Sequence, residues 1–187
     1  MNDYSEYLKG KMLDYIESEW LKNPAFHDGY ANIINGAIEK YKTKNVVEIG
    51  CGTGEVAKRL KVKYYTGIDA NEDCIRIASS KNSEHCHFYV KDIRQAEFLK
   101  PFDLCFTFAF LKHFGFHEWS EIFKKCASFG KYFIFDIPIG EKKDDGTEFH
   151  HVWFTREDIE KECKDAGLKI LDVQQINKEE FCFITVK

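Results

Sequence analysis

Residues 46–56, with the sequence VVEIGCGTGEV, constrain the fold more than any other part of the chain. Their apolar, β-branched start is typical of a buried strand, and Glu48 adds an acid close to the strand's end. Gly50, Gly52 and Gly54 follow at alternate positions, before a helical pattern begins. Because glycine has no Cβ, its backbone can bend sharply and lie against a ligand. The segment predicts a strand, a tight ligand-binding turn and a helix start.

The spacing of these glycines differs from that of a dinucleotide-binding turn. In such a turn the third glycine comes three residues after the second. Here Gly54 comes two residues after Gly52, and Glu55 holds the next position. An acid at the end of the strand is also unfavourable beside a pyrophosphate. The turn therefore favours a ligand that has a cationic end and no phosphate.

Beyond residue 44 the chain alternates between strand-like and helix-like segments. We expect strands at 45–49, 64–68, 87–90, 103–108 and 131–137, and helices at 55–62, 72–81, around 119–126 and from Thr155 to Gly167. Two last strands, 168–174 and 180–186, are expected to pair antiparallel at one edge. This alternation predicts an α/β fold, a doubly wound and mostly parallel sheet with helices on both faces.

Two further helices are expected before the first strand, at 3–20 and 27–41, with a break at Asn23-Pro24. The first is amphipathic, and both lie outside the alternating pattern. We expect them to form an N-terminal helical cap over residues 1–43, followed by a single compact ligand-binding domain over residues 44–187.

The charge of the chain and its cysteine content indicate which kinds of partner and which cellular compartment to expect. The formal net charge is −4, and only four of the 27 basic residues are arginine, so a nucleic-acid partner is not expected. The seven cysteines are scattered without a C-x-x-C pair, which favours reduced thiols in a cytoplasmic protein. The polar start and the lack of a long apolar run predict neither a signal peptide nor a membrane span.

The glycine segment resembles the first motif of the class I S-adenosylmethionine-dependent methyltransferases. The resemblance covers about residues 44–187. It implies a seven-stranded sheet in the order 3-2-1-4-5-7-6, with the last strand antiparallel. It also implies S-adenosylmethionine as cofactor and S-adenosylhomocysteine as product.

Several residues take roles that this resemblance implies. Glu48 would support the glycine turn and the amino-acid end of the ligand. Asp69, at the end of the second strand, is suited to both ribose hydroxyls, the alternative being a solvated strand-end acid. Asp92 would take the adenine amino group, with Ile93 as an apolar wall, or would simply cap a turn. The expected cofactor-binding residues are Glu48, Gly50, Cys51, Gly52, Gly54, Asp69, Ala70, Asp92, Ile93 and Phe108.

Residues beyond the fourth and fifth strands are the candidates for the acceptor. Ligands of open α/β sheets bind at the carboxyl ends of the strands, which places the segment 107–113 beside the reactive end of the cofactor. His113 is the candidate general base, the alternative being a packing histidine. The charged loop 140–151 is expected to be mobile and to overhang the acceptor. The expected acceptor-binding residues are Phe110, His113, Asp136, His151 and Trp153.

Histidines also recur at spacings that could ligate a metal ion. His113 and His117 are four residues apart, His150 and His151 are adjacent, and His85 and His87 flank Cys86. Phe114-Gly115-Phe116 interrupts the first pair, and no second pair stands at a recognisable spacing. We therefore expect no metal site.

These features predict methyl transfer to a small-molecule acceptor. The aromatic-rich N-terminal helices suit a lid that shields such an acceptor from water. One alternative is a methyltransferase acting on RNA or protein, for which the basic run at residues 58–63 could supply a positive surface. The other is a non-catalytic sensor or partner subunit that binds S-adenosylmethionine.

Overall fold

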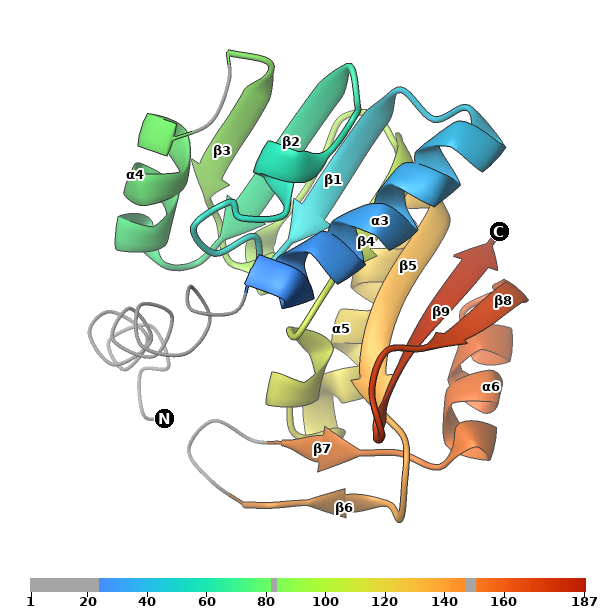
Figure 1. Ribbon diagram of the computed structural model, residues 1–187. Coiled ribbons are helices and arrows are strands. Elements are labelled where there is room, and N and C mark those ends of the chain that lie inside the picture. The colour runs from blue at the N-terminus through green and yellow to red at the C-terminus, as the bar shows by residue number, and fades with distance from the viewer. Residues whose placement is uncertain (1–23, 82–83, 147–150) are drawn as a thin grey trace. The chain divides into compact units, whose positions relative to one another are not determined.

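The computed structural model describes residues 24–81, 84–146 and 151–187 (Figure 1). The helix expected over residues 3–20 lies outside them. The chain divides into two compact units, Met1–Glu97 and Phe98–Lys187. This boundary differs from the division expected after residue 43, and the N-terminal cap stays a prediction.

A seven-stranded sheet runs through the fold in the order β3-β2-β1-β4-β5-β9-β8. This is the predicted order, because the predicted sixth and seventh strands are β8 and β9. Parallel pairing joins β1 to β2, β2 to β3 and β4 to β5, whereas β9 runs antiparallel to both β5 and β8. The strands are β1 Asn45–Ile49, β2 Tyr64–Asp69, β3 Cys86–Val90, β4 Phe102–Thr107, β5 Gly130–Pro138, β8 Lys169–Gln175 and β9 Glu180–Val186.

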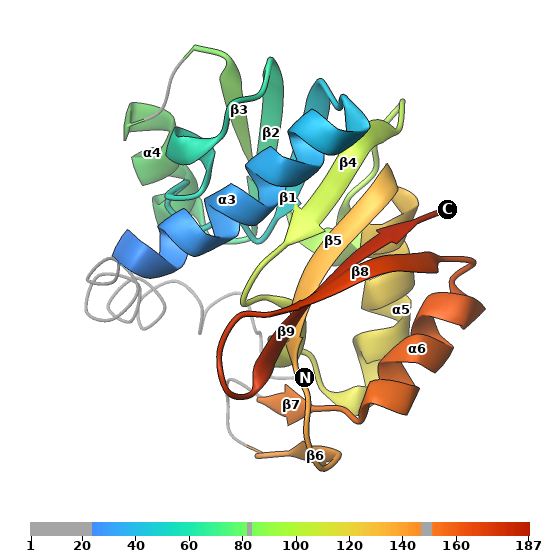
Figure 2. The same cartoon turned by 45° about the vertical axis from the view of Figure 1, so that its right-hand side comes forward.

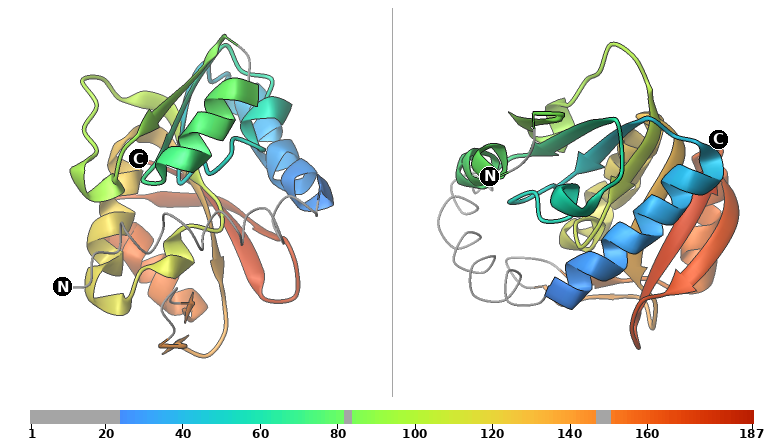
Figure 3. Two further views of the ribbon diagram at one scale, coloured as in Figure 1. Left: turned by 90° about the vertical axis from the view of Figure 1, so that its left-hand side faces the viewer. Right: turned by 45° about the horizontal axis from the view of Figure 1, so that its top comes forward.

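The first unit contains the helix α3, Pro24–Tyr41, and the helix α4, Glu72–Lys81. Pro24 begins α3, a position where its fixed φ and missing N–H are tolerated. The helix α4 packs against β2 and β3 (Figure 3). Two single 3-10 turns complete the described part of the unit, η2 at Ala57–Arg59 and η3 at Ile93–Gln95.

The second unit contains α5, Phe116–Ser128, and α6, Arg156–Asp165, which lie on the same face of its strands (Figure 2). As the spacing predicted, Trp119, Ile122, Phe123 and Cys126 of α5 are buried. Phe123 packs edge-on against Phe135 of β5, with ring centroids 5.0 Å apart. The predicted capping box of α6 is present, since Thr155 and Asp158 bond each other's backbone amides.

The predicted helix over residues 55–62 is wrong. Only η2 forms there, and the chain turns extended at Leu60. Asn35 of α3 explains the early end, because its side chain donates to the Arg59 carbonyl at 3.0 Å and accepts from the Lys61 amide at 2.8 Å. These bonds occupy two backbone groups that a continuing helix would use.

Two smaller predictions are also corrected. The fourth strand begins and ends one residue earlier than expected, at Phe102–Thr107. The segment 140–151 is not irregular throughout, because β6, Lys143–Asp144, pairs with β7, Val152–Trp153, as a short antiparallel ribbon. Residues 147–150, which include His150, lie outside the described residues.

Candidate functional site

The turn after β1 has the backbone that its glycines were expected to allow. Gly50, Gly52 and Gly54 all take positive φ angles, 71°, 50° and 73°. The amides of Gly50 and Cys51 both donate to the Ile68 carbonyl of β2, at 2.9 and 3.0 Å. Side chains with a Cβ rarely adopt this conformation, so the turn depends on glycine at all three positions.

Asp69 fastens this turn to the end of β2. One carboxylate oxygen accepts from the Gly52 amide at 2.9 Å, and the other accepts from the Asn71 amide at 2.8 Å. Burial raises the pKa of Asp69 above its usual range, while these two amide bonds oppose the rise. Each oxygen keeps a further lone pair, so the carboxylate can still accept from a hydroxyl. The ribose role of Asp69 stays a prediction.

Glu48 lies on β1, just before the turn, and is 4% exposed. Its carboxyl accepts a short hydrogen bond from the Tyr65 hydroxyl on β2. Burial raises the pKa of Glu48 from 4.5 to about 8, against the lowering effect of the Tyr65 bond. The carboxyl is therefore largely protonated at neutral pH, and it acts here as part of a buried hydrogen-bonded pair.

The sequence alone did not identify Tyr65 and Gly67 as parts of this support. A Cβ at Gly67 would lie 2.8 Å from the Cys51 sulfur and 2.8 Å from the Phe88 ring. Only glycine fits that position without movement of its neighbours. The available signal was the alternation along β2, which places Tyr65, Gly67 and Asp69 on one face.

Asp92 has the capping role that was one of its two interpretations. Its side chain accepts from the Arg94 amide at 2.8 Å at the start of η3, and it forms an ion pair with the Arg94 guanidinium at 3.2 Å. Ile93 and Cys51 are buried, and Ala70 is half-buried. A contact of Asp92 with adenine stays a prediction.

In the second unit, the chain leaves β4 through a strained turn. Ala109 has a φ of +50°, which is uncommon for a residue with a side chain. Its amide donates to a carboxylate oxygen of Asp136 on β5 at 2.8 Å. Asp136 is 2% exposed, so it holds this turn rather than facing solvent. Phe108 is buried and Phe110 is half-buried beside Phe114, with ring centroids 4.9 Å apart.

Three of the predicted acceptor residues lie together. His113 ends the 3-10 turn η4, Leu111–His113, and its ring centroid lies 5.1 Å from that of His151. The His151 ring lies 6.0 Å from the ring of Trp153 on β7. The Trp153 indole donates to Glu179 at 3.4 Å, and Lys143 lies 4.3 Å from the ring centroid.

An ion pair beside these rings was not foreseen. The Lys112 ammonium donates to Glu180 at 3.0 Å, with the two side chains 17% and 9% exposed. Asn177 donates to the other Glu180 oxygen at 3.0 Å. Burial and the Lys112 charge lower the pKa of His151, so its imidazole is neutral at physiological pH. Residues this far apart in sequence give no local signal of pairing.

Within the described residues, no group of three or more histidine, cysteine or acidic side chains could hold a metal ion. His113 and His117 lie on separate elements, because η4 ends before α5 begins. All seven cysteines are unpaired, and six of them are buried. No helix in the described part of the chain is long and apolar enough to cross a membrane.

Comparison with known proteins finds similarity to methyltransferases. Residues 46–131 match the family model described as a methyltransferase domain. A putative methyltransferase of Geobacillus sp. strain WCH70 is 30% identical over 95 residues, which are 46% of this chain and 38% of that protein. Malonyl-[acyl-carrier protein] O-methyltransferase 2 of Ilyobacter polytropus is 28% identical over 148 residues, 70% of this chain and 57% of that protein. The chain thus spans less than two thirds of the length of these relatives.

Solved structures share the fold over nearly the whole chain. Magnesium protoporphyrin IX methyltransferase from Synechocystis PCC 6803 with bound SAH superposes with a TM-score of 0.80 at 15% identity, covering 98% of this chain and 97% of that one. A S-adenosylmethionine-dependent methyltransferase from Clostridium acetobutylicum superposes with a TM-score of 0.74 at 16% identity, covering 94% and 98%. The predicted Rossmann-like fold is confirmed.

Proposed function

We propose that this chain is a class I S-adenosylmethionine-dependent methyltransferase that transfers a methyl group to a small-molecule acceptor. The fold and the match of residues 46–131 support this proposal. The observation that carries the proposal is the glycine turn after β1. Its three left-handed glycines are fastened by the Asp69–Gly52 bond to the end of β2. This leaves a tight backbone that a ligand can approach closely, next to an acid suited to ribose hydroxyls.

The residues of this turn fit an adenosyl cofactor. Thr53 is 1% exposed, and its hydroxyl makes no hydrogen bond with the residues that the structure describes. Buried hydroxyls nearly always have a partner, and a polar ligand above the turn would supply one. The proposed cofactor, S-adenosylmethionine, supplies an electrophilic methyl group on a sulfonium sulfur. Asp69 would hold its ribose.

On the acceptor side, His113, His151 and Trp153 supply an aromatic, partly polar surface. Methyl transfer is an in-line displacement, so the main task of the protein is to orient the acceptor in a site from which water is excluded. A base is needed only where the acceptor carries a proton that must leave. His113 is proposed for that role, with neutral His151 beside it.

A small-molecule acceptor is supported by charge and by the names of relatives. The net charge of −4 gives no overall attraction to nucleic acid. One structural neighbour is named for magnesium protoporphyrin IX, and one relative is named for a malonyl group on acyl-carrier protein. The basic run at residues 58–63 supports the macromolecular alternative less well, because Lys58 and Arg59 already pair with Glu55.

Transfer of a labelled methyl group tests this proposal. The full chain is incubated with methyl-labelled S-adenosylmethionine and, separately, with a metabolite extract, total RNA or total protein. We expect label in the metabolite fraction alone. Label in RNA or protein would overturn the small-molecule assignment. Cofactor binding without transfer to any fraction would favour the sensor or partner-subunit alternative.

A further inference from the structure

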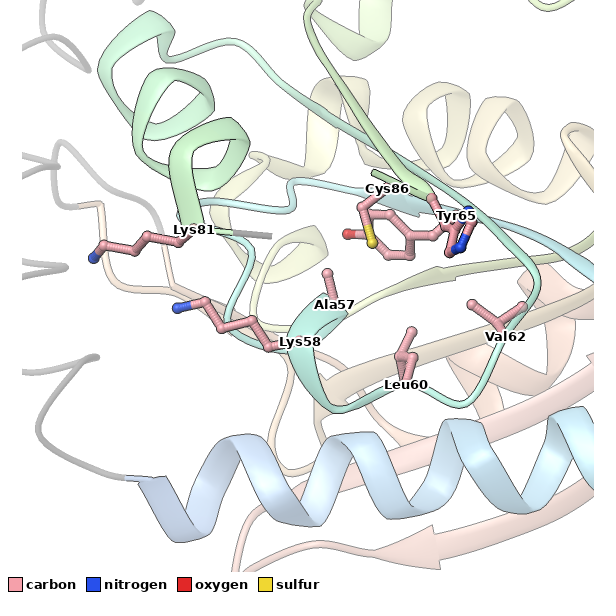
Figure 4. Close-up of a pocket in the computed structure, with 8 residues that line it drawn as sticks. Ala57, Lys58, Leu60, Val62, Tyr65, Lys81 and Cys86 are labelled. Atoms are coloured by element: carbon pink, nitrogen blue, oxygen red, sulfur yellow. The ribbon is translucent and has the colours of Figure 1, made fainter. Parts of the chain in front are cut away.

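The first unit contains a cavity that the glycine turn does not line (Figure 4). Its volume is about 240 Å³. Its walls come from η2 and the residues after it, from Tyr65 of β2, from the end of α4, and from His85 and Cys86 at the start of β3. The residues that matter here are Ala57, Leu60, Val62, Tyr65, Lys58 and Lys81.

The cavity lies beside the place where a helix was expected and is missing. Parallel strands are commonly joined by a crossover helix that covers the sheet. Between β1 and β2 this chain has only the three residues of η2, because Asn35 captures the backbone at Arg59 and Lys61. A connection this short covers less of the sheet than a full helix would, and a hollow remains beside Tyr65.

The interior of the cavity suits an apolar group. Ala57, Leu60 and Val62 contribute only hydrocarbon side chains. The ring of Tyr65 lies in the wall, but its hydroxyl already donates to the buried carboxyl of Glu48. An apolar group inside the cavity would contact these hydrocarbon side chains, while His85 and Cys86 add polar groups to the remaining wall.

The charged side chains that line the cavity are both cationic. Lys58 and Lys81 extend to the same side in Figure 4, and no acidic side chain among the described residues lines the cavity. Lys81 forms no ion pair with any residue that the structure describes. Lys58 is paired with Glu55 at 2.5 Å, but Arg59 also reaches Glu55, at 3.4 Å, and could keep that acid paired if Lys58 turned to a ligand.

We propose that this cavity is a second ligand site, which binds a small organic anion through an apolar body held beside Tyr65 and an anionic head at Lys58 and Lys81. A carboxylate and a phosphate ester share this chemistry. Lysine acts as a point charge toward either head group, so the two differ in strength rather than in mode of binding. The site is independent of the proposed methyl transfer.

Binding of simple probes to the full chain tests the proposal without cofactor or turnover. Amide NMR spectra are recorded during titration with hexanoate, hexyl phosphate, neutral hexanol and cationic hexylammonium. We expect saturable shifts at residues 57–62 with both anions, and binding at least about tenfold weaker with hexanol and hexylammonium. Tighter binding of one anion identifies the head group that the site prefers.

Two variants and a control complete the test. Lys81→Met should weaken binding of the anions about fivefold, and Val62→Phe should abolish it by filling the cavity. Lys63→Met is the control. It also removes one positive charge near the cavity, but Lys63 does not line the cavity, so binding should persist. Circular dichroism confirms that each variant is folded. Equal binding of hexanol and hexanoate, equal loss with Lys63→Met, or no saturable shift up to about 10 mM would overturn the proposal.

Discussion

The carboxylate of Asp69 joins the glycine turn to the start of α4 through the amides of Gly52 and Asn71. In the proposed function Asp69 has two roles. Its remaining lone pairs would accept from the ribose hydroxyls, and its two amide bonds hold the shape of the turn. Substitutions of Asp69 can therefore distinguish how much its charge and how much its hydrogen bonds contribute to the affinity for the ligand.

We expect Asp69→Ala to lower the affinity for S-adenosylmethionine at least tenfold, because two charge-assisted hydrogen bonds of roughly 1.5–3 kcal/mol each are lost. Asp69→Asn keeps one acceptor oxygen and should lose less. Calorimetric titration measures both, with circular dichroism as the check on folding. Asp73→Ala, at an exposed acid of α4, is the matched control. Dissociation constants that match the parent chain would show that Asp69 does not bind the ribose.

The buried pair of Glu48 and Tyr65 predicts a pH dependence of stability. The pKa of Glu48 is about 8 in the folded chain, against an ordinary value of 4.5. The Glu48 carboxyl of the folded chain therefore stays protonated up to about pH 8, whereas that of the unfolded chain loses its proton as pH rises through 4.5. The free energy of unfolding should fall between about pH 4.5 and 8, by up to about 5 kcal/mol from this group, and level off above that range.

Glu48→Gln isolates this contribution, since glutamine is close in shape and does not titrate. Urea denaturation of both chains at several pH values gives the difference in unfolding free energy. The parent chain should lose stability relative to the variant as pH rises from 5 to 8. A difference that stays constant over this range would show that Glu48 has an ordinary pKa.

Among the elements, those with a strong apolar period were predictable and those limited by a tertiary contact were not. β1 and α5 were predicted from their patterns of apolar residues, because only one secondary structure buries all of these side chains together. The helix after β1 failed because the side chain of Asn35, more than twenty residues earlier, bonds the backbone at its end. Likewise, Lys112 and Glu180 meet only in the folded second unit. A local pattern carries no information on such contacts.

The contribution of the Asn35 contacts to stability can be measured by substituting this side chain. Asn35→Ala leaves the Arg59 carbonyl and the Lys61 amide without their partner. We expect a loss of about 1–2 kcal/mol in the free energy of unfolding, measured in urea. Asn35→Asp keeps the acceptor for the Lys61 amide but sets a carboxylate oxygen against the Arg59 carbonyl, so it should not restore the stability of the parent chain. Equal stability of Asn35→Ala and the parent chain would mean that water replaces both bonds without cost.

At the scale of the whole molecule, the proposed acceptor class depends on the N-terminal cap. Deleting residues 1–20 should leave a folded chain that still binds cofactor. Transfer to the acceptor found in the labelling screen should fall much further than binding, because water enters the site and the acceptor loses one wall. Turnover that survives the deletion would remove the main support for a small-molecule acceptor and would favour RNA or protein.

The glycine turn is proposed as a site for an adenosyl ligand rather than for a dinucleotide. Gly54 is one residue too early for the dinucleotide pattern, and Glu48 is buried on β1 just before the turn. Calorimetric titration of the full chain with S-adenosylmethionine, S-adenosylhomocysteine and NAD tests this most directly. We predict binding of both adenosyl ligands in the micromolar range, about −8 kcal/mol, and no measurable binding of NAD. Binding of NAD more tightly than either adenosyl ligand would contradict the account.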